Sequence, residues 1–221
     1  MFIGHYGPAA LGAGASPSIK LWQAFIAVQL LDFVYCTLVL LGIEDMRIIP
    51  GFTEASALDL HFMPYSHSLL FSVFWAGLGA ALFWAMTGRK NTKGAVIFAA
   101  LVLSHWATDW LVHIPDLTLW PGSEKYGLGL WRNLMVSLPL ELVFGLGAML
   151  YFISKTKAQS PKAKIWAGIF LAVLGALQIY SNFAPAPTSN AEFAISALFA
   201  YTLLVFLAAR FERSRGVAGA V

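Results

Sequence analysis

Six apolar stretches, each long enough to cross a bilayer as a helix, constrain the fold of this chain more than any other feature. A helix needs about 20 residues to cross a hydrocarbon core of about 30 Å. Stretches of that length lie at residues 21–43, 67–87, 94–115, 129–153, 164–183 and 193–210. Of the 221 residues, 59% are hydrophobic and only 11% are charged, outside the range of soluble domains. We therefore expect an all-α, polytopic membrane helical bundle that forms a single integral membrane domain over residues 1–221.

The basic residues predict the orientation of this bundle. They concentrate at the ends of the spans that would face one side of the membrane: Lys20, Arg89, Lys90, Lys93, Lys155, Lys157, Lys162, Lys164, Arg210, Arg213 and Arg215. The other side has only Arg47, Lys125 and Arg132 as cations. By the positive-inside rule we expect a multi-pass protein of the plasma (inner) membrane with both termini in the cytoplasm. No clustered basic face remains that would indicate nucleic-acid binding.

The segment before the first span has features of a short helix of its own. Pro8 suits the first turn of a helix, and Ser16-Pro17 suits a break. We expect a re-entrant or half helix over about residues 8–15, which would bring His5 near the midplane of the membrane before the chain turns at Lys20. The segment lacks the basic n-region and long apolar core of a signal peptide, so we expect it to be retained.

The span at 94–115 carries His105, Asp109 and His113 at successive i, i+4 positions, so the three side chains share one helix face. An ionisable group near the bilayer centre costs roughly 2.5–3.5 kcal/mol on insertion scales, so these groups indicate a functional interior. Counting 1.5 Å per residue from the ends of the spans brings Asp32 to about the depth of His105. His67 begins the second span, and Glu141 lies near mid-depth on the fourth span.

These histidines and carboxylates could surround one polar cavity in the outer half of the bundle. We predict a metal site formed by His5, Asp32, His67, His105, Asp109 and His113, with Asp109 and Glu141 as the candidate catalytic residues. Imidazole and carboxylate ligands suit zinc, the first expectation, and also manganese or iron(II). Two metals about 3.5–4 Å apart would need roughly this number of ligands. The lone Cys36 excludes a thiolate cluster within the chain.

Several of these residues carry a family resemblance. His5, Asp32, the segment Tyr65 to Leu70 (YSHSLL) and the segment Ser104 to Asp109 (SHWATD) resemble, in order and spacing, the pattern of the membrane-bound metal-dependent hydrolase family of bacteria and archaea. The resemblance covers about residues 1–125, and residues 129–210 supply the remaining helices. The chain departs from the family pattern at Asp32. The family usually has two acids there, whereas this chain has Gln29-Leu30-Leu31-Asp32.

The family is similar in turn to zinc-dependent phospholipase C and single-strand nucleases, which also carry His-x-x-x-Asp on a helix. The resemblance implies a membrane-embedded hydrolase in which metal-activated water attacks a phosphoester or lipid-like substrate from the extracytoplasmic side, with Asp109 or Glu141 accepting the proton. Expected partners are membrane lipids and a small-molecule or lipid substrate.

Other functions fit the same residues. A proton- or metal-ion-coupled transporter or permease could use the His and Asp cluster as a relay. A haem protein could use His67 and His105 as axial ligands. In a purely structural role, His105 and Asp109 would pair to fasten helices.

Single residues have alternatives as well. Glu141 could pair with Arg132 or Asn133, and Ser66 could cap the second span. Water could satisfy His113 and Asp116 at the outer boundary. The expected aromatic belt at the outer interface consists of Trp106, Trp110, Trp120 and Trp131.

Overall fold

The computed structural model describes residues 1–217, in which seven α-helices carry the fold. Six of them have the length and hydropathy to cross a membrane: α2 (Leu21–Leu40), α3 (Leu69–Met86), α4 (Thr92–Val112), α5 (Leu134–Lys155), α6 (Pro161–Phe183) and α7 (Asn190–Arg213). The seventh, α1 (Tyr6–Ala15), follows the 3-10 turn η1 (Ile3–His5). The prediction of an all-α bundle with six spans and a short N-terminal half helix is confirmed.

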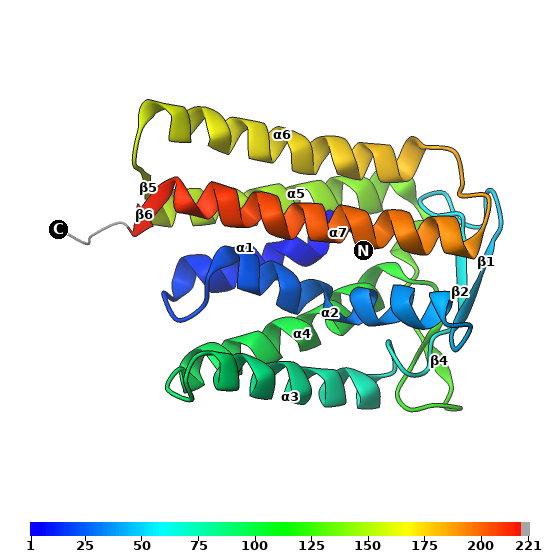
Figure 1. Ribbon diagram of the computed structural model, residues 1–221. Coiled ribbons are helices and arrows are strands. Elements are labelled where there is room, and N and C mark those ends of the chain that lie inside the picture. The colour runs from blue at the N-terminus through cyan, green and yellow to red at the C-terminus, as the bar shows by residue number, and fades with distance from the viewer. Residues whose placement is uncertain (218–221) are drawn as a thin grey trace.

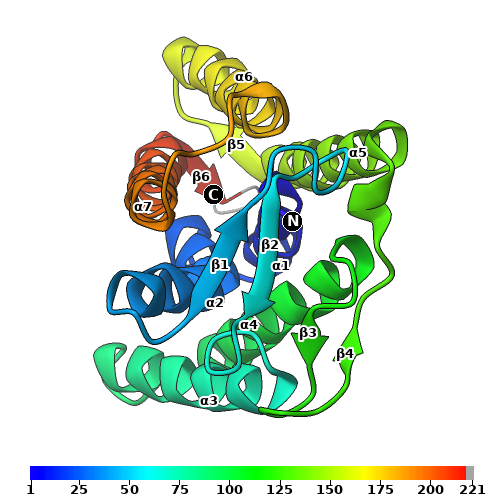
Figure 2. The same ribbon diagram turned by 90° about the vertical axis from the view of Figure 1, so that its right-hand side faces the viewer.

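The short helix α1 lies inside the bundle. The long helices run roughly along one axis (Figure 1), and the end-on view places α1 between α2, α4 and α5 (Figure 2). Small residues allow this packing, because Ala9 and Ala10 are fully buried and a Cβ at Gly7 would lie only 3.0 Å from the Phe144 ring. The helix therefore starts at the centre of the bundle, and His5, the residue before its first turn, lies there.

The two ends of the bundle differ in structure. At one end, which we call the capped end, two antiparallel hairpins lie over the helices (Figure 2). One pairs β1 (Asp45–Ile48) with β2 (Leu58–Phe62), and the other pairs β3 (Leu117–Thr118) with β4 (Lys125–Tyr126), followed by the 3-10 turn η2 (Leu130–Arg132). At the basic end, β5 (Thr156–Ala158) pairs with β6 (Arg215–Val217). The basic end collects the lysines and arginines at the ends of the spans.

The interior toward the basic end is apolar. Phe25, Phe170 and Phe211 are buried there, and the rings of Phe170 and Phe211 stack with centroids 4.9 Å apart. Phe152 packs against Phe211 from α5. The polar residues that sequence analysis singled out lie on the other side of this aromatic layer, toward the capped end.

The start of α3 differs from the prediction. The helix begins at Leu69, and its N-cap is Ser68, whose hydroxyl accepts a hydrogen bond from the Phe71 N–H over 3.4 Å. The expectation that Ser66 caps this helix is therefore wrong. His67 precedes the helix and lies in an irregular segment, and Ser66 is free for another role.

The first residues pack into the bundle. Met1 is buried, and its amino group is 2.6 Å from Asp109 Oδ1. The side of the membrane to which the N-terminus belongs stays a prediction. The last four residues, to which the expectation of a cytoplasmic C-terminus applies, lie outside the described residues.

Candidate metal centre

The six predicted ligands meet in one buried cluster. His5 comes from η1, Asp32 from the middle of α2, and His67 from the segment before α3. The other three come from α4 and its C-terminal end: His105, Asp109 and His113. All side chains except that of Asp32 are at most 3% exposed, whereas that of Asp32 is 16% exposed. Asp32 is therefore the member of the cluster most open to an approaching molecule.

Asp109 lies at the centre of the cluster and divides the histidines into two pairs. Its Oδ1 atom is 3.1 Å from His5 Nε2 and 3.3 Å from His113 Nε2. Its Oδ2 atom is 3.0 Å from His105 Nε2 and 3.6 Å from His67 Nε2. We call these pairs, each with its oxygen, the Oδ1 group and the Oδ2 group.

Asp32 belongs to the Oδ2 group. Its Oδ1 atom lies 3.4 Å from His67 Nε2 and 3.6 Å from His105 Nε2. Its other oxygen accepts a hydrogen bond from the Gln29 side-chain amide, which fixes the carboxylate. Asp32, His67 and His105 offer ligand atoms that all lie within 4.8 Å of one another, and so do His5, His105 and Asp109.

The hydrogen bonds at Nδ1 orient the two imidazoles of the Oδ2 group. His105 Nδ1 contacts the Val28 carbonyl, which can only accept, so this nitrogen carries the proton. Ser66 donates its hydroxyl hydrogen to Glu44 Oε2 over 2.6 Å, because the carboxylate can only accept. The Ser66 oxygen then accepts from His67 Nδ1 over 2.8 Å. Both Nε2 atoms therefore face the cluster.

The imidazoles of the Oδ1 group are held in the same way. The Thr108 hydroxyl donates to the Ser104 carbonyl, so its oxygen accepts from His5 Nδ1 over 2.8 Å. His113 Nδ1 donates to Asp116 Oδ1 over 2.9 Å. Metal-binding histidines characteristically donate the other ring nitrogen to such acceptors, because this fixes the tautomer and the ring orientation.

The Nε2 atoms of the four histidines lie close together. In the neutral tautomer that the Nδ1 contacts favour, none of these Nε2 atoms carries a hydrogen to donate to another. His67 Nε2 and His105 Nε2 are 3.2 Å apart. The His5 and His105 rings stack with their centroids 3.7 Å apart. His5 Nε2 is buried and has no hydrogen-bond partner among residues 1–217. The Met1 ammonium beside Asp109 Oδ1 supplies one positive charge near these groups. The donor set of imidazole nitrogens and carboxylates also fits a divalent metal ion.

The N-terminal segment closes one side of the cluster. The Met1 amino group donates to Asp109 Oδ1 over 2.6 Å, and the Phe2 N–H donates to Glu141 Oε2 over 2.6 Å. Glu141 Oε1 accepts a weaker hydrogen bond from Trp131 Nε1 over 3.4 Å. Glu141 thus holds the N-terminal segment, and the described residues form no ion pair between it and Arg132.

Two of the four tryptophans expected in an interfacial belt belong to the cluster instead. Trp131 stacks on His113 with ring centroids 4.3 Å apart, and Trp106 donates its indole N–H to the His67 carbonyl over 2.9 Å. Trp110 and Trp120 are 38% and 56% exposed, so for these two the interfacial belt stays a prediction. Trp106 and Trp131 depart from the expected belt because they contact the ligand histidines His67 and His113.

His113 lies just beyond the end of α4. Burial alone would lower its pKa, but the carboxylates of Asp116 and Asp109 raise the pKa to about 9. Without a metal, this imidazole is therefore held as a cation between two acids. The expectation that bulk water satisfies His113 and Asp116 is wrong, because both are buried and paired with each other.

Sequence reasoning missed the residues that orient the ligands. Glu44, Thr108 and Gln178 are buried, and each holds the cluster or the N-terminal segment through a hydrogen bond. The role of Thr108 could have been inferred from the sequence, because it lies between His105 and Asp109 on the same turn of α4. The roles of Glu44 and Gln178 could not, because their hydrogen-bond partners are distant in the sequence.

Comparisons with known proteins give a family and no activity. No curated protein and no solved structure matches the chain. A family model described as "YdjM inner membrane protein" matches residues 57–212, which include His67, His105, Asp109 and His113. With its six apolar spans, the chain belongs to the YdjM inner membrane protein family and is a multi-pass protein of the inner membrane.

Proposed function

We propose that the protein is a membrane-embedded, metal-dependent hydrolase that acts on a phosphoester or lipid-like substrate. The observation that carries the proposal is the convergence of four buried Nε2 atoms on Asp109, each with its Nδ1 hydrogen donated to a fixed acceptor. A site used only to fasten helices would pair donors with acceptors. This site instead directs the Nε2 atoms of His5, His67 and His105, which carry no hydrogen in the neutral tautomer described above, toward one another and toward carboxylates.

The two oxygens of Asp109 favour two metal ions rather than one. The Oδ1 group offers His5 and His113 once the Met1 ammonium, 2.6 Å from Oδ1, has moved away or lost its proton. The Oδ2 group offers His67, His105 and Asp32. A single carboxylate that joins two ligand groups is suited to a pair of ions at the separation typical of hydrolytic two-metal sites, about 3.5–4 Å. Zinc is the first candidate, because three-ligand sets of His and carboxylate with room for water are typical of catalytic zinc.

In such a site the metal supplies Lewis-acid polarisation of the substrate and activation of water. The protein residues have separate roles. Asp109 holds the two ligand groups together, so its lone pairs are already engaged. Asp32 is the most exposed carboxylate of the cluster and has an amide donor at Oδ2. Because its Oδ1 atom is a proposed ligand, we assign the exchange of protons with an incoming substrate to Glu141, whose Oε1 atom accepts only the 3.4 Å hydrogen bond from Trp131.

Two observations favour this function over the alternatives. A relay for transport would have to continue to the basic end, where Phe25, Phe170 and Phe211 fill the interior. Bis-histidine haem ligation needs a macrocycle between the two nitrogens, and His67 Nε2 and His105 Nε2 are only 3.2 Å apart. The resemblance of the Ser104 to Asp109 segment to metal-dependent hydrolases supports the same choice. By the positive-inside rule, the capped end and its substrate would be extracytoplasmic.

The test is the metal content of detergent-purified protein, measured by plasma mass spectrometry, followed by hydrolysis assays with bis-nitrophenyl phosphate and phospholipid vesicles. We expect bound zinc in the wild type, its loss in His105→Ala and Asp109→Gln, and its retention in the control His61→Ala, which alters a histidine of β2 outside the cluster. A wild type that binds no zinc after zinc is added would exclude the proposal. Zinc binding without hydrolysis of either probe would leave a metal site but remove the catalytic assignment.

A further inference from the structure

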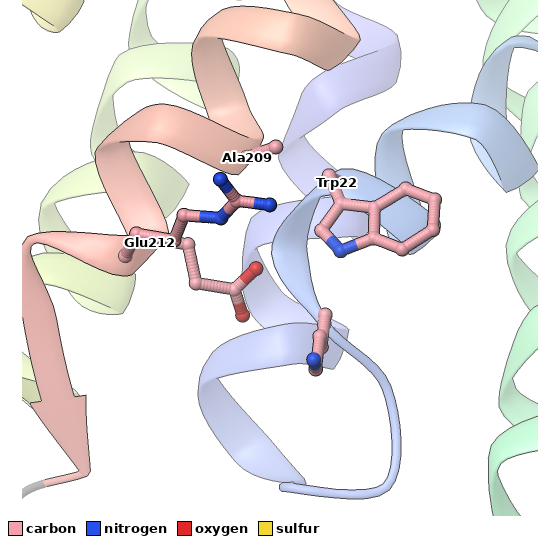
Figure 3. Close-up of a pocket in the computed structure, with 5 residues that line it drawn as sticks. Trp22, Ala209 and Glu212 are labelled. Carbon is pink, nitrogen blue, oxygen red and sulfur yellow. The ribbon is translucent and has the colours of Figure 1, made fainter.

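A second polar site lies at the basic end, away from the metal cluster. A cavity of about 500 Å³ opens between the start of α2 and the end of α7 and is lined by Lys20, Trp22, Ala209, Glu212 and Arg213. Figure 3 shows Trp22 on one side of this cavity, with Ala209 and Glu212 across from it on α7. The proposed hydrolase does not use these residues.

Three hydrogen-bond donors around this cavity lack acceptors. Within residues 1–217, the Lys20 ammonium, the Arg213 guanidinium and the Trp22 indole N–H form no hydrogen bond or ion pair with another side chain or carbonyl. Lys20 and Arg213 are exposed, and Trp22 is partly buried. A ligand with several acceptor oxygens would satisfy all three donors at once.

The carboxylate of the cavity is already engaged. Glu212 Oε1 accepts the Leu21 N–H over 3.0 Å, so it caps the start of α2, where the helix dipole favours a negative charge. The two cations and this one carboxylate leave the cavity with a net charge of one positive. A phosphodiester has a single negative charge and four oxygens, two of them non-bridging acceptors, so it matches both the charge and the donors.

The depth of the cavity identifies the source of the phosphodiester. Lys20 precedes the first residue of one span and Arg213 is the last residue of another, so the cavity lies at the level of lipid headgroups. One turn further into the membrane, on the same face of α7 as Ala209, Phe206 is 58% exposed and can contact an acyl chain. We propose that this cavity binds the phosphodiester of a membrane glycerophospholipid, with Lys20, Arg213 and Trp22 as donors.

The proposal can be tested by native mass spectrometry of detergent-purified protein titrated with phosphatidylglycerol. We expect a one-lipid adduct in the wild type, and about fivefold weaker retention in Lys20→Gln and in Arg213→Gln, as expected for the loss of one cation near a lipid phosphate. Trp22→Phe keeps the ring and removes the N–H, and should weaken retention about twofold. Glu212→Gln keeps an acceptor for Leu21 but removes the negative charge, so it should strengthen retention.

The control is Lys162→Gln, which removes an exposed cation at the same end but outside the cavity. An equal loss of lipid in this control would show attraction by charge alone and overturn the site. Competition by millimolar inorganic phosphate, together with no lipid adduct, would assign the cavity to a free anion and overturn the lipid proposal. Circular dichroism of each variant identifies any loss of lipid that results from unfolding.

Discussion

Ser66 and Glu44 form a short hydrogen bond, with the Ser66 hydroxyl 2.6 Å from Glu44 Oε2. Glu44 Oε1 also accepts the N–H groups of Tyr65 and Ser66, so the carboxylate is fixed on three sides. Because the hydroxyl must donate to this carboxylate, its oxygen is left to accept from His67. Glu44, an acid outside the cluster, therefore determines through Ser66 which ring nitrogen of His67 carries the hydrogen.

Removal of this hydroxyl should weaken metal binding without removing a ligand. We expect Ser66→Ala to lower zinc affinity about 10- to 100-fold, the usual effect of losing an outer partner of a ligand histidine. Ser66→Thr retains the hydroxyl and should restore most of the affinity. Competition with a zinc-sensitive dye measures the effect, and Ser196→Ala, on the exposed face of α7, is the control. Equal affinities of the Ala and Thr variants would show that the hydroxyl does not orient His67.

The two ligand groups around Asp109 predict a stoichiometry. If each oxygen serves its own ion, His5→Gln should remove one equivalent of zinc and leave the ion of the Oδ2 group, and His67→Gln should do the opposite. The double variant should retain neither equivalent. Metal content per protein molecule measures this directly. A wild type with one equivalent, lost completely in either single variant, would indicate a mononuclear site with shared ligands.

Much of the fold followed from the sequence because the bilayer leaves few alternatives. A continuous apolar stretch of 18 or more residues has to form a helix in a membrane, so the spans could be predicted without knowledge of their neighbours. The half helix was predictable from Pro8 and the break at Ser16-Pro17, and it begins only two residues earlier than expected. The i, i+4 spacing on α4 was enough to place His105, Asp109 and His113 on one face.

The support of the cluster could not be predicted in the same way. Glu44 reaches Ser66 only because the hairpin formed by β1 and β2 brings back a segment 22 residues further along the chain. The Val28 carbonyl that orients His105 is a backbone group, and no residue type reveals it. The hydropathy of Trp106 and Trp131 suits an interface equally well as a contact with imidazole rings, so the pattern alone could not distinguish the two.

Gln178 is predicted to stabilise the N-terminal segment from α6. Its Oε1 atom accepts the Ile3 N–H over 3.1 Å, and the side chain is 1% exposed. Gln178→Leu keeps the volume but leaves a buried N–H without a partner, which costs roughly 1–3 kcal/mol. We expect a clearly lower melting temperature in detergent, whereas Gln159→Leu, at an exposed turn, should melt like the wild type. An unchanged melting temperature of Gln178→Leu would show that water or another group takes over this hydrogen bond.

Two glycines of α5 test how closely η1 must approach the helix. A Cβ at Gly145 would lie 2.7 Å from the Ile3 carbonyl oxygen, whereas a Cβ at Gly147 would have no atom within 4 Å. Alanine stabilises a helix interior by up to about 1 kcal/mol relative to glycine, so Gly147→Ala should be neutral or slightly stabilising. Gly145→Ala forces the backbone of η1 away and should cost about 1–3 kcal/mol, as overpacking usually does.

The same variant connects packing to the metal centre, because His5 lies two residues after Ile3. When η1 moves, His5 Nε2 moves away from Asp109, so Gly145→Ala should lose the zinc of the Oδ1 group and retain that of the Oδ2 group. Melting temperature and metal content, measured on the same preparations of both variants, separate the two effects. Full zinc content in a destabilised Gly145→Ala would show that η1 can shift without moving His5, and that the position of this ligand does not depend on the close contact with α5.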